Sequence, residues 1–160
     1  MQLRRGTPED SAALTALQQA AYAPLKARLG LSLPPADADF AEVLAEREVW
    51  LAEDDDTLRA AAIFEVKPDH LLIWSLAVAP ACKGEGLGNA LLGFAEARAQ
   101  ELGLTIVRLY TNALFVENIA WYQRRGYELT GETEPFPYED ERFGRATRDD
   151  LAFVVLERAI

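Results

Sequence analysis

The sequence contains a single cysteine and a single histidine, and it has no long apolar run. With Cys82 alone, the chain can form neither an internal disulfide nor a cysteine-based metal site. His70 alone argues against a histidine-rich metal site and a conventional Ser-His-Asp triad. No apolar stretch reaches the roughly 18 residues of a membrane span, and the opening MQLRRGTPED lacks the apolar segment of a secretory signal. We therefore expect a cytoplasmic protein with no metal and no membrane partner.

Positive charge is also scarce, because 16 Lys and Arg stand against 26 Asp and Glu, for a formal net charge of −10. Proteins that bind nucleic acids usually present a basic face, since phosphate contacts supply most of their affinity. No cluster of Lys and Arg in this sequence is large enough, so we expect no nucleic-acid partner. Solubility is a sufficient explanation of the acidity, and attraction of a cationic or amine substrate is the sharper alternative.

The chain has 160 residues, half of them hydrophobic, which suits one compact domain spanning residues 1–160. In its first half, the patterns predict a strand at 1–7, a helix at 7–30, a loop at 31–39, a helix at 39–48 and a hairpin of strands 49–54 and 59–67. In its second half, they predict a strand at 70–78, a helix at 86–102, a strand at 105–111 and a helix at 116–125. Strands at 127–132 and 151–158 then flank a polar loop at 133–150. That order predicts one mixed α/β sheet with helices on both faces and a right-handed parallel crossover from His70 to Thr111.

The stretch AVAPACKGEGLGNALLGFAEARAQEL, residues 77–102, runs from a strand through a glycine-rich turn into an amphipathic helix. Backbone amides at a helix N-terminus lack partners within the helix, and the helix dipole makes that end partly positive. Glycines at positions 84, 86 and 88 let the backbone approach a bulky anion closely. The turn therefore predicts a cradle for phosphate or pyrophosphate. The alternative is a tight turn that holds no ligand.

Two common nucleotide-binding patterns do not fit this turn. The dinucleotide fingerprint G-x-G-x-x-G/A fails from Gly84, where its last position is Asn89, and from Gly86, where its last position is Leu91. The P-loop pattern fails because no Lys-Ser/Thr pair opens the helix. If the turn holds a phosphate, that phosphate therefore belongs to a ligand that neither of these two motifs binds.

The segment LAVAPACKGEGLGNALLGFAEARAQELGL resembles the acetyl-CoA segment of the GNAT superfamily of N-acetyltransferases. That family carries Q/R-x-x-G-x-G/A at this place, and the pattern here reads Lys83, Gly86, Gly88. Lysine keeps a positive charge but lacks the planar fork of arginine. The later segment LYTNALFVENIAWYQRRGYELTG resembles a second family segment, with Asn118 and Tyr122 at its helix.

The resemblance covers the order of elements over almost the whole chain and is weakest at 30–40 and 134–150, where an acceptor would be selected. It implies a mostly antiparallel sheet of about seven strands, in which the central parallel pair splays apart after Val78. It also implies that pantetheine pairs with the backbone near Leu76 and Val78 and that the pyrophosphate lies on amides from Gly84 to Ala90. The cofactor-binding residues expected for acetyl-CoA are Leu76, Val78, Lys83, Gly84, Gly86, Leu87, Gly88, Asn89, Ala90, Asn118 and Tyr122, and no metal is expected.

The family transfers an acetyl group directly from coenzyme A to an amine, which must be neutral to attack. A proton donor helps the thiolate leave, and a tyrosine with a pKa of about 10 is protonated at neutral pH. Tyr122 matches the family's donor position, although an aromatic residue there could simply fill the core. Asn118 lies four residues earlier on the same helix face and is expected to hydrogen-bond the cofactor, unless it only begins the helix. Asn112 is a weaker candidate.

No general base is evident in the sequence. Trp74 and Ser75 stand where family members often place a carboxylate, and Ser75 could hold a water molecule. Glu65 and His70 are further candidates, each more readily explained as a solvated or structural residue. Cys82 has no activating base beside it and is read as incidental. The loop at 133–150 is either a surface loop or a wall of the acceptor site.

We therefore expect an acetyltransferase that moves the acetyl group of acetyl-CoA to a primary amine of an unidentified small-molecule acceptor. One alternative is a catalytically inactive CoA-binding sensor or structural protein. The others are transfer from a different acyl-CoA and transfer to a protein N-terminal or lysine amine. The family's habit also suggests a homodimer.

Overall fold

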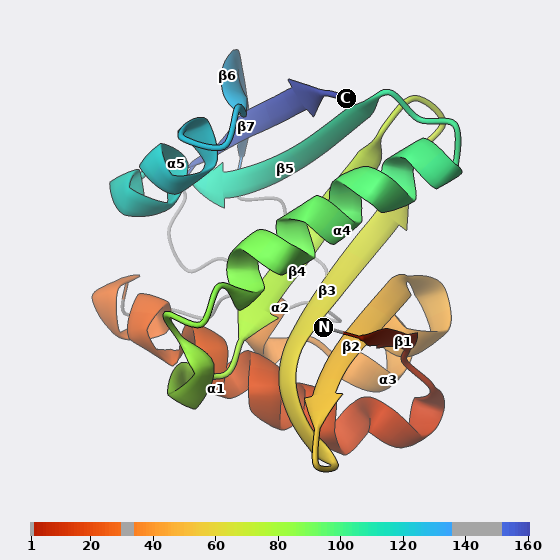
Figure 1. The fold of residues 1–160 in the computed structure, drawn as a ribbon. Helices are drawn as coiled ribbons and strands as arrows, with labels where there is room; N and C mark the ends of the chain where they lie inside the picture. The colour runs from red at the N-terminus through yellow and green to blue at the C-terminus, as the bar shows by residue number, and fades with distance from the viewer. Residues whose placement is uncertain (1, 30–33, 136–151) are drawn as a thin grey trace.

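A computed structural model describes residues 2–29, 34–135 and 152–160 of the chain. Its elements are β1 (Leu3–Arg5), η1 (Pro8–Asp10), α1 (Ser11–Leu29), α2 (Pro34–Asp37), α3 (Phe40–Glu46), β2 (Glu48–Asp54), β3 (Thr57–Val66), β4 (Leu71–Val78), η2 (Pro80–Cys82), α4 (Leu87–Glu101), β5 (Ile106–Asn112), α5 (Val116–Gln123), β6 (Glu128–Pro135) and β7 (Ala152–Ala159). The strands form one seven-stranded sheet in the order β1-β2-β3-β4-β5-β7-β6, as Figure 1 shows. Only β4 and β5 pair in parallel, so the predicted mixed and mostly antiparallel sheet is confirmed.

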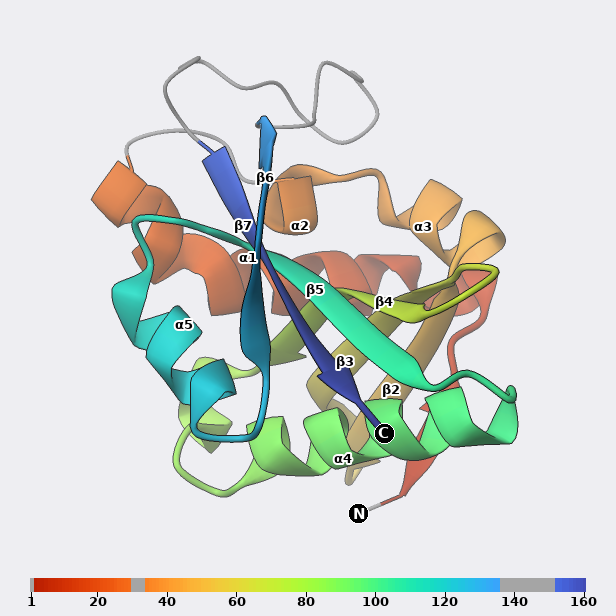
Figure 2. The same ribbon diagram turned by 90° about the horizontal axis from the view of Figure 1, so that it is seen from above.

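Helices cover both faces of this sheet, and the two faces carry separate hydrophobic clusters. On one face, α1 and α3 pack their apolar stripes, including Leu14, Leu17 and Val43, against β2, β3 and β4. On the other face, α4 packs Leu91 and Ala95 against the opposite side of the same strands and of β5. Viewed from above in Figure 2, the sheet lies between the layer of α1, α2 and α3 and the layer of α4.

The acidic turn of the first hairpin forms as its sequence predicts. Asp55 and Asp56 both have left-handed backbone angles, with φ of +49° and +61°. Two consecutive residues with positive φ define the turn type whose twist matches that of paired antiparallel strands, and aspartate tolerates this conformation better than most residues. The hairpin of β2 and β3 therefore closes tightly at these two residues.

Two expected loops contain regular structure. Residues 34–37, predicted as part of a loop, form the single helical turn α2, which begins at a proline, a residue suited to the first turn of a helix. This turn is held to α1 by two contacts. Gln18 Nε2 donates to the Pro35 carbonyl over 2.8 Å, and the Lys26 side chain pairs with the Asp37 side chain over 2.7 Å. Residues 133–135, also predicted as loop, extend β6 opposite β7. The rest of the polar loop, from residue 136 to 150, lies outside the described residues.

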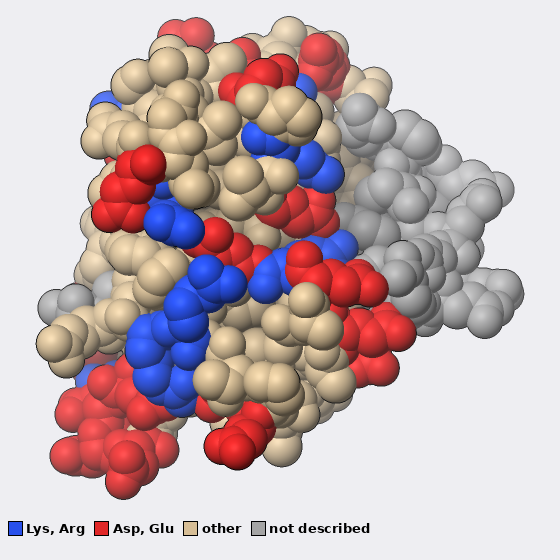
Figure 3. Space-filling model, turned by 90° about the vertical axis from the view of Figure 1, so that its right-hand side faces the viewer, with Lys and Arg blue, Asp and Glu red and all other residues tan. Residues whose placement is uncertain are grey.

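Ion pairs join neighbouring elements at the surface. Arg98 of α4 donates to Glu48 of β2 over 2.6 Å, and Arg108 of β5 donates to Glu157 of β7 over 2.8 Å. Over the face shown in Figure 3, acidic and basic side chains are interleaved. None of the helices in the described part of the chain combines the length and the apolar character needed to cross a bilayer.

Candidate active site

The sheet opens between β4 and β5, and this opening is the centre of the candidate site. Leu71–Ile73 of β4 pair with Val107–Leu109 of β5, and the strands pair no further. Strand β4 nevertheless continues to Val78 and β5 to Asn112. The strands therefore part after Ile73, and the expectation that they splay after Val78 was wrong.

A β-bulge explains why the strands part so early. In the pairing of β3 with β4, Ile63 lies opposite Ser75 and Phe64 lies opposite Ile73, which leaves Trp74 as an extra residue. A bulge bends its strand and increases the local twist. Strand β4 therefore turns away from β5 at Trp74, and a notch forms between them.

The same bulge brings two consecutive side chains to one face of the sheet. Ile73 and Leu76 pack on the α4 face, whereas Trp74 packs with the α1 face. Ser75 also points to the α1 face, because its hydroxyl contacts side chains of α1. In a regular strand these neighbours would face opposite sides. The bulge thus gives the notch a polar group, Ser75, on the α1 side.

The edge of β4 that faces the notch carries the backbone groups of Leu76 and Val78. Ala79 N donates to the carbonyl of Arg59 over 2.8 Å, so the backbone groups of Ala79 face β3. Because these groups alternate along a strand, those of Ala77 also face β3, and those of Leu76 and Val78 face the notch. The Val78 backbone groups and the Leu76 amide are therefore available to an extended ligand, whereas the Leu76 carbonyl accepts a long hydrogen bond from the Tyr22 hydroxyl over 3.5 Å.

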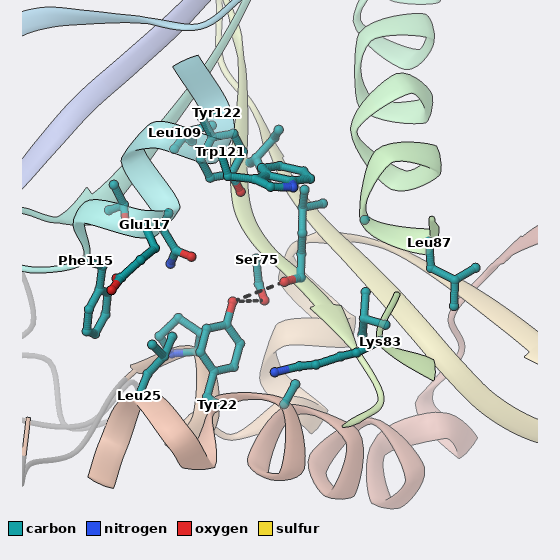
Figure 4. Close-up of a pocket in the computed structure, with 18 of the residues that line it drawn as sticks. Tyr22, Leu25, Ser75, Lys83, Leu87, Leu109, Phe115, Glu117, Trp121 and Tyr122 are labelled. Atoms are coloured by element: carbon teal, nitrogen blue, oxygen red, sulfur yellow. Dashed lines mark hydrogen bonds between the residues drawn. The ribbon is translucent and has the colours of Figure 1, made fainter. Parts of the chain in front are cut away.

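A cavity of about 800 Å³ runs through the notch from the turn before α4 to the side of α1 (Figure 4). Its walls come from α1, β4, the glycine turn, β5 and α5. The structure brings together at this cavity most of the predicted site residues, namely Ser75, Leu76, Val78, Lys83, Gly84, Gly86, Leu87, Gly88, Asn89, Asn118 and Tyr122.

Ala90 and Glu65 are predicted residues that do not line the cavity. The Ala90 amide donates to the Gly86 carbonyl over 3.1 Å as the first bond of helix α4, so it is not free for a ligand. Glu65 forms ion pairs with Arg47 over 2.7 Å and with Lys67 over 2.8 Å. Burial raises the pKa of Glu65, but hydrogen bonds from Lys67 and Arg47 outweigh this effect and lower the pKa overall. A paired carboxylate outside the cavity is no base for this site, and Glu65 is withdrawn as a candidate.

The glycine turn presents unpaired amides to the cavity. Gly84 and Gly86 have φ of +84° and +81°, and a Cβ added at either residue would meet no atom within 4 Å. Gly86 is the N-cap of α4, and no side chain caps this end of the helix. The amides of Leu87, Gly88 and Asn89 therefore have no partner within the helix and carry the positive end of its dipole. The turn fits an anionic group that approaches the backbone closely.

Residues of α5 pack directly against this cradle. A Cβ added at Gly88 would lie 3.4 Å from the Trp121 ring, an ordinary van der Waals distance, so the ring lies next to the turn. The guanidinium of Arg125 lies over the same ring, 3.8 Å from its centroid, and donates to Asn89 Oδ1. Arg125 thus fixes Asn89, at the first turn of α4, and adds positive charge near the cradle.

Tyr122 lies where α5 faces the notch. Its ring contacts those of Trp121 and Tyr127 edge to face, with centroids 4.9 and 5.8 Å away. Its hydroxyl makes no hydrogen bond to another residue in the described parts of the chain. Burial, with a smaller contribution from Tyr22, raises the pKa of Tyr122 well above its ordinary value, against a weak opposing effect of Arg125. The hydroxyl therefore stays protonated at neutral pH and has a proton to donate.

Tyr22 and Ser75 form the polar centre on the α1 side. The Tyr22 hydroxyl and Ser75 Oγ are 2.9 Å apart (Figure 4). Gln18 Nε2 donates to Ser75 Oγ over 3.0 Å. Burial raises the pKa of Tyr22, and the hydrogen bond with Ser75 acts weakly in the opposite direction. The pair therefore offers neutral hydroxyl groups to the cavity.

Tyr22 was not among the residues expected from the sequence. A signal was present, since Leu14, Leu17, Gln18 and Ala21 follow the spacing of one buried helix face. Gln18 is a polar residue on that apolar face and is fully buried in the structure. Tyr22, at the position four residues further, shares the face. A polar residue at a core position predicts a buried partner, which here is Ser75.

The two asparagines expected near the cofactor both line the cavity. Asn118 lies in the first turn of α5 and is half-buried. Asn112 ends β5 and is only 3% exposed. Its Oδ1 accepts from the Leu114 amide over 2.9 Å, whereas its Nδ2 has no partner among the described residues.

His70 and Cys82, two further residues considered in the sequence, lie outside the cavity or at its edge. The Nδ1 atom of His70 lies 2.7 Å from Asp69, and His70 does not line the cavity. Cys82 is buried at the edge of the cavity, in the turn η2. The described residues contain no group of three His, Cys, Asp or Glu side chains that could hold a metal ion.

Charged side chains stand at the rims of the cavity. Lys83 and Arg124 form no ion pair with a described residue, and the Lys83 side chain extends across the cavity toward α1 in Figure 4. Glu117 is the only carboxylate among the described residues that line the cavity. It pairs with Arg28 over 3.3 Å, and the Arg28 guanidinium also lies 5.6 Å from the Phe115 ring centroid. These contacts join the ends of α1 and α5 beside the cavity.

Comparisons with known proteins agree with this geometry. The model of the acetyltransferase (GNAT) family matches residues 14–127, and no curated protein matches the sequence. A PaiA N-acetyltransferase from Thermoplasma acidophilum, solved in complex with coenzyme A, is similar with a TM-score of 0.75 at 14% identity, covering 99% of this chain and 98% of that chain. An IAA acetyltransferase from Bacillus cereus is similar with a TM-score of 0.69 at 19% identity, covering 99% of both chains. The ribosomal-protein-S18-alanine N-acetyltransferase from Escherichia coli has a TM-score of 0.69 at 18% identity, covering 99% of this chain and 93% of that chain.

Proposed function

The chain belongs to the acetyltransferase (GNAT) family, and on this premise we propose that it transfers the acetyl group of acetyl-CoA directly to a primary amine. One observation carries the proposal: a single cavity joins the amide cradle of the glycine turn to Tyr122 and to the Tyr22–Ser75 pair. The continuity of the sheet from β1 to β6 supports a single N-acetyltransferase domain over residues 1–160. Cytoplasmic location and a homodimer remain expectations from the sequence.

The cavity's residues fit coenzyme A in three parts. The unpaired amides at the start of α4, with Lys83 and Arg125 nearby, suit the pyrophosphate. The backbone edge at Leu76 and Val78 suits the amide groups of pantetheine, which can pair with it as a short extra strand once the long contact from Tyr22 to the Leu76 carbonyl gives way. The thioester would then lie where the strands part, within reach of Tyr122. Bound there, acetyl-CoA supplies an acyl group that is activated for attack by an amine.

The chemistry needs one proton removed and one supplied. The amine nitrogen bonds to the acetyl carbon, the bond from carbon to sulfur breaks, and the electron pair leaves with sulfur. Tyr122 donates its hydroxyl proton to that sulfur, and its raised pKa keeps the hydroxyl protonated until then. The amine proton leaves through water, which the neutral hydroxyls of Ser75 and Tyr22 can hold on the α1 side.

The acceptor that we propose first is a small molecule. The competing function is a coenzyme A sensor without catalysis. This alternative is favoured by the lack of a free carboxylate that could act as a base. The single carboxylate in the described lining of the cavity, Glu117, is already paired with Arg28. Release of the coenzyme A thiol in the presence of a panel of amines separates the two functions, since a sensor gives no amine-dependent release.

The cofactor assignment is tested by two isosteric changes at one residue. Gly86→Asn and Gly86→Asp both fit the open space and tolerate a left-handed backbone. Only the aspartate puts a negative charge on the cradle. Acetyl-CoA at a hundred times its Kd should stabilise the wild type by about 2.7 kcal/mol in thermal unfolding. Gly86→Asn should bind with similar affinity and Gly86→Asp at least about tenfold more weakly. No stabilisation of the wild type, or equal binding by the two variants, would refute the assignment.

A further inference from the structure

One buried hydrogen-bond donor in the cavity has no partner in the described structure. Asn112 is 3% exposed and lines the cavity, and its Oδ1 is engaged by the Leu114 amide over 2.9 Å. Its Nδ2 is buried and has no hydrogen-bond partner among the described residues. Buried donors are nearly always paired, because an unpaired donor has lost its water without replacement. An oxygen of a ligand that reaches this donor from the cavity would satisfy it.

The position of Asn112 on β5 indicates which ligand supplies that oxygen. Val107 and Leu109 pack in the cluster that α4 covers. Side chains alternate along a strand, and β5 stays paired with β7 as far as Asn112, so Tyr110 and Asn112 face the α1 side. The cradle for coenzyme A lies at the start of α4, on the opposite side. The unpaired donor thus belongs to the acceptor half of the cavity.

Asn112 and Ser75 flank the notch from opposite strands, close to its start. Ser75 is two residues beyond Ile73 and Asn112 is three residues beyond Leu109, the last paired residues of β4 and β5. Because Trp74 is an extra residue in the bulge, Ser75 advances only one strand step beyond Ile73, so at about 3.3 Å per residue the two positions along the strands differ by roughly two residues. A ligand whose amine lies beside Ser75 can therefore place an oxygen at Asn112 when the two groups are only a few bonds apart.

The rest of the acceptor half is apolar and aromatic, with walls formed by Leu25, Phe115 and Phe153. Because its carboxylate, Glu117, is paired with Arg28, the described lining offers no free acidic group to a second cationic group on the acceptor. On the basis of the proposed function, we propose that Asn112 Nδ2 donates a hydrogen bond to the acceptor. The acceptor is then an amine with a carbonyl oxygen on the adjoining carbon, as in an amino acid or an amino-acid amide.

Matched acceptors test this assignment. L-phenylalaninamide and L-phenylalanine carry the carbonyl oxygen, and 2-phenylethylamine is the same amine without it; L-alaninamide and ethylamine form a smaller pair. The wild type should show a higher kcat/KM for each amide than for its matched amine, compared at equal concentrations of neutral amine. The free amino acid distinguishes a carboxylate oxygen from an amide oxygen as the preferred partner.

Two variants isolate the donor. Asn112→Asp keeps an oxygen for the Leu114 amide but replaces the Nδ2 donor by an oxygen, and Asn112→Ser is a neutral second variant that can also accept from Leu114. Each should lower the ratio of kcat/KM for amide over amine at least about tenfold. Ratios between variants do not depend on the differing pKa values of the acceptor amines. An unchanged ratio in both folded variants would overturn the assignment, as would a rise in the KM for acetyl-CoA with an unchanged acceptor preference.

Failure of this inference can be told apart from failure of the proposed function. If the wild type binds acetyl-CoA and acetylates 2-phenylethylamine as well as L-phenylalaninamide, only the role of Asn112 fails. If the wild type releases no thiol with any amine, calorimetric titration of the CoA-saturated protein with each matched pair decides the question. Tighter binding of the amide, lost in Asn112→Ser, supports the acceptor site without catalysis, whereas equal affinities overturn it.

Discussion

The hydroxyl oxygens of Tyr22 and Ser75 lie 2.9 Å apart and join α1 to β4 beside the notch. Gln18 Nε2 completes the group by donating to Ser75 Oγ over 3.0 Å. Ser75 reaches this position only because the bulge at Trp74 turns it toward α1. One irregular residue in the sheet therefore both opens the notch and supplies the hydroxyl that faces the acceptor.

We expect Tyr22→Phe to weaken use of the amine without affecting acetyl-CoA. The change removes one hydroxyl from the pair and lowers the free energy of unfolding by about 1 kcal/mol. It should raise the KM for the amine or lower kcat by about tenfold, because water on the α1 side loses a partner. Steady-state kinetics with each substrate varied in turn would measure this effect.

The control for Tyr22→Phe is Thr15→Val, on the same helix. Thr15 Oγ1 donates to the Ser11 carbonyl over 2.6 Å and does not line the cavity. Its loss should cost a comparable amount of stability in urea unfolding but leave both KM values unchanged. If the two variants have the same kinetic effect, Tyr22 acts only through the stability of α1.

Tyr122→Phe should lower kcat by about a hundredfold, the usual scale for loss of a general acid. Acetyl-CoA should still stabilise the variant. Tyr127→Phe is the matched control, since this buried tyrosine packs against Tyr122 but lies outside the cavity and donates to Glu96 over 3.3 Å. It should lose stability and keep its kcat. Equal kcat values for the two variants would remove Tyr122 from the mechanism.

With an alkylamine acceptor such as ethylamine, the rate should also rise with pH and keep rising toward pH 10. A lysine-like amine has a pKa of about 10.4, so its neutral fraction grows over this range. Because burial holds the pKa of Tyr122 above its usual value of about 10, the donor stays protonated as the amine loses its proton. A falling limb of kcat below pH 9 in the wild type that disappears in Tyr122→Phe would contradict the raised pKa.

Two glycines of α4 allow a separation of helix stability from cofactor binding. Gly93 is exposed, and a Cβ there would meet nothing within 4 Å, so Gly93→Ala should stabilise the protein by up to about 1 kcal/mol through helix propensity alone. Gly88→Ala makes the same change in the first turn, where a Cβ would come 3.4 Å from Trp121. It should bind acetyl-CoA about tenfold more weakly, because the methyl group stands at the cradle. Calorimetric titration of both variants would show whether binding follows position or helix stability.

The sequence predicted the glycine turn and the helix after it because their causes are local. The glycines and the helical spacing after Gly86 all lie within residues 77–102. The same holds for the acidic hairpin turn at Asp55 and Asp56. Each of these features follows from backbone preferences of the residues that form it.

The notch and its polar centre were not predictable in the same way. LLIWSLAV is almost continuously apolar, so no change of period in the sequence marks the bulge at Trp74. The pairing of Ser75 with Tyr22 joins residues 53 positions apart. The structural role of Glu65, which the sequence already favoured, could not be assigned to a partner for the same reason, because Arg47, which pairs with it, lies on a different part of the chain. Such contacts depend on how the elements pack, which a single sequence does not display.

Asp10 should make the stability of the protein depend on pH. Its carboxylate accepts from the Thr7 amide over 2.7 Å and from the Arg4 guanidinium over 2.7 and 2.9 Å, at the start of the helical segment. The hydrogen bonds from Arg4 hold the pKa of Asp10 far below its usual range, more strongly than burial raises it. We expect Asp10→Asn to cost about 1 kcal/mol at pH 7.

The sign of the pH dependence follows from this lowered pKa. A carboxyl group whose pKa is lower in the folded protein stabilises it above the unfolded value of about 3.9, and the contribution disappears as the pH falls below that value. The difference in free energy of unfolding between the wild type and Asp10→Asn should therefore be constant from pH 7 to about pH 5 and shrink steadily toward pH 3. Urea unfolding across this range would measure it, with the exposed neighbour Glu9→Gln as a control. A difference that stays constant down to pH 3 would mean that Asp10 acts only through its shape at the helix start, not through its charge beside Arg4.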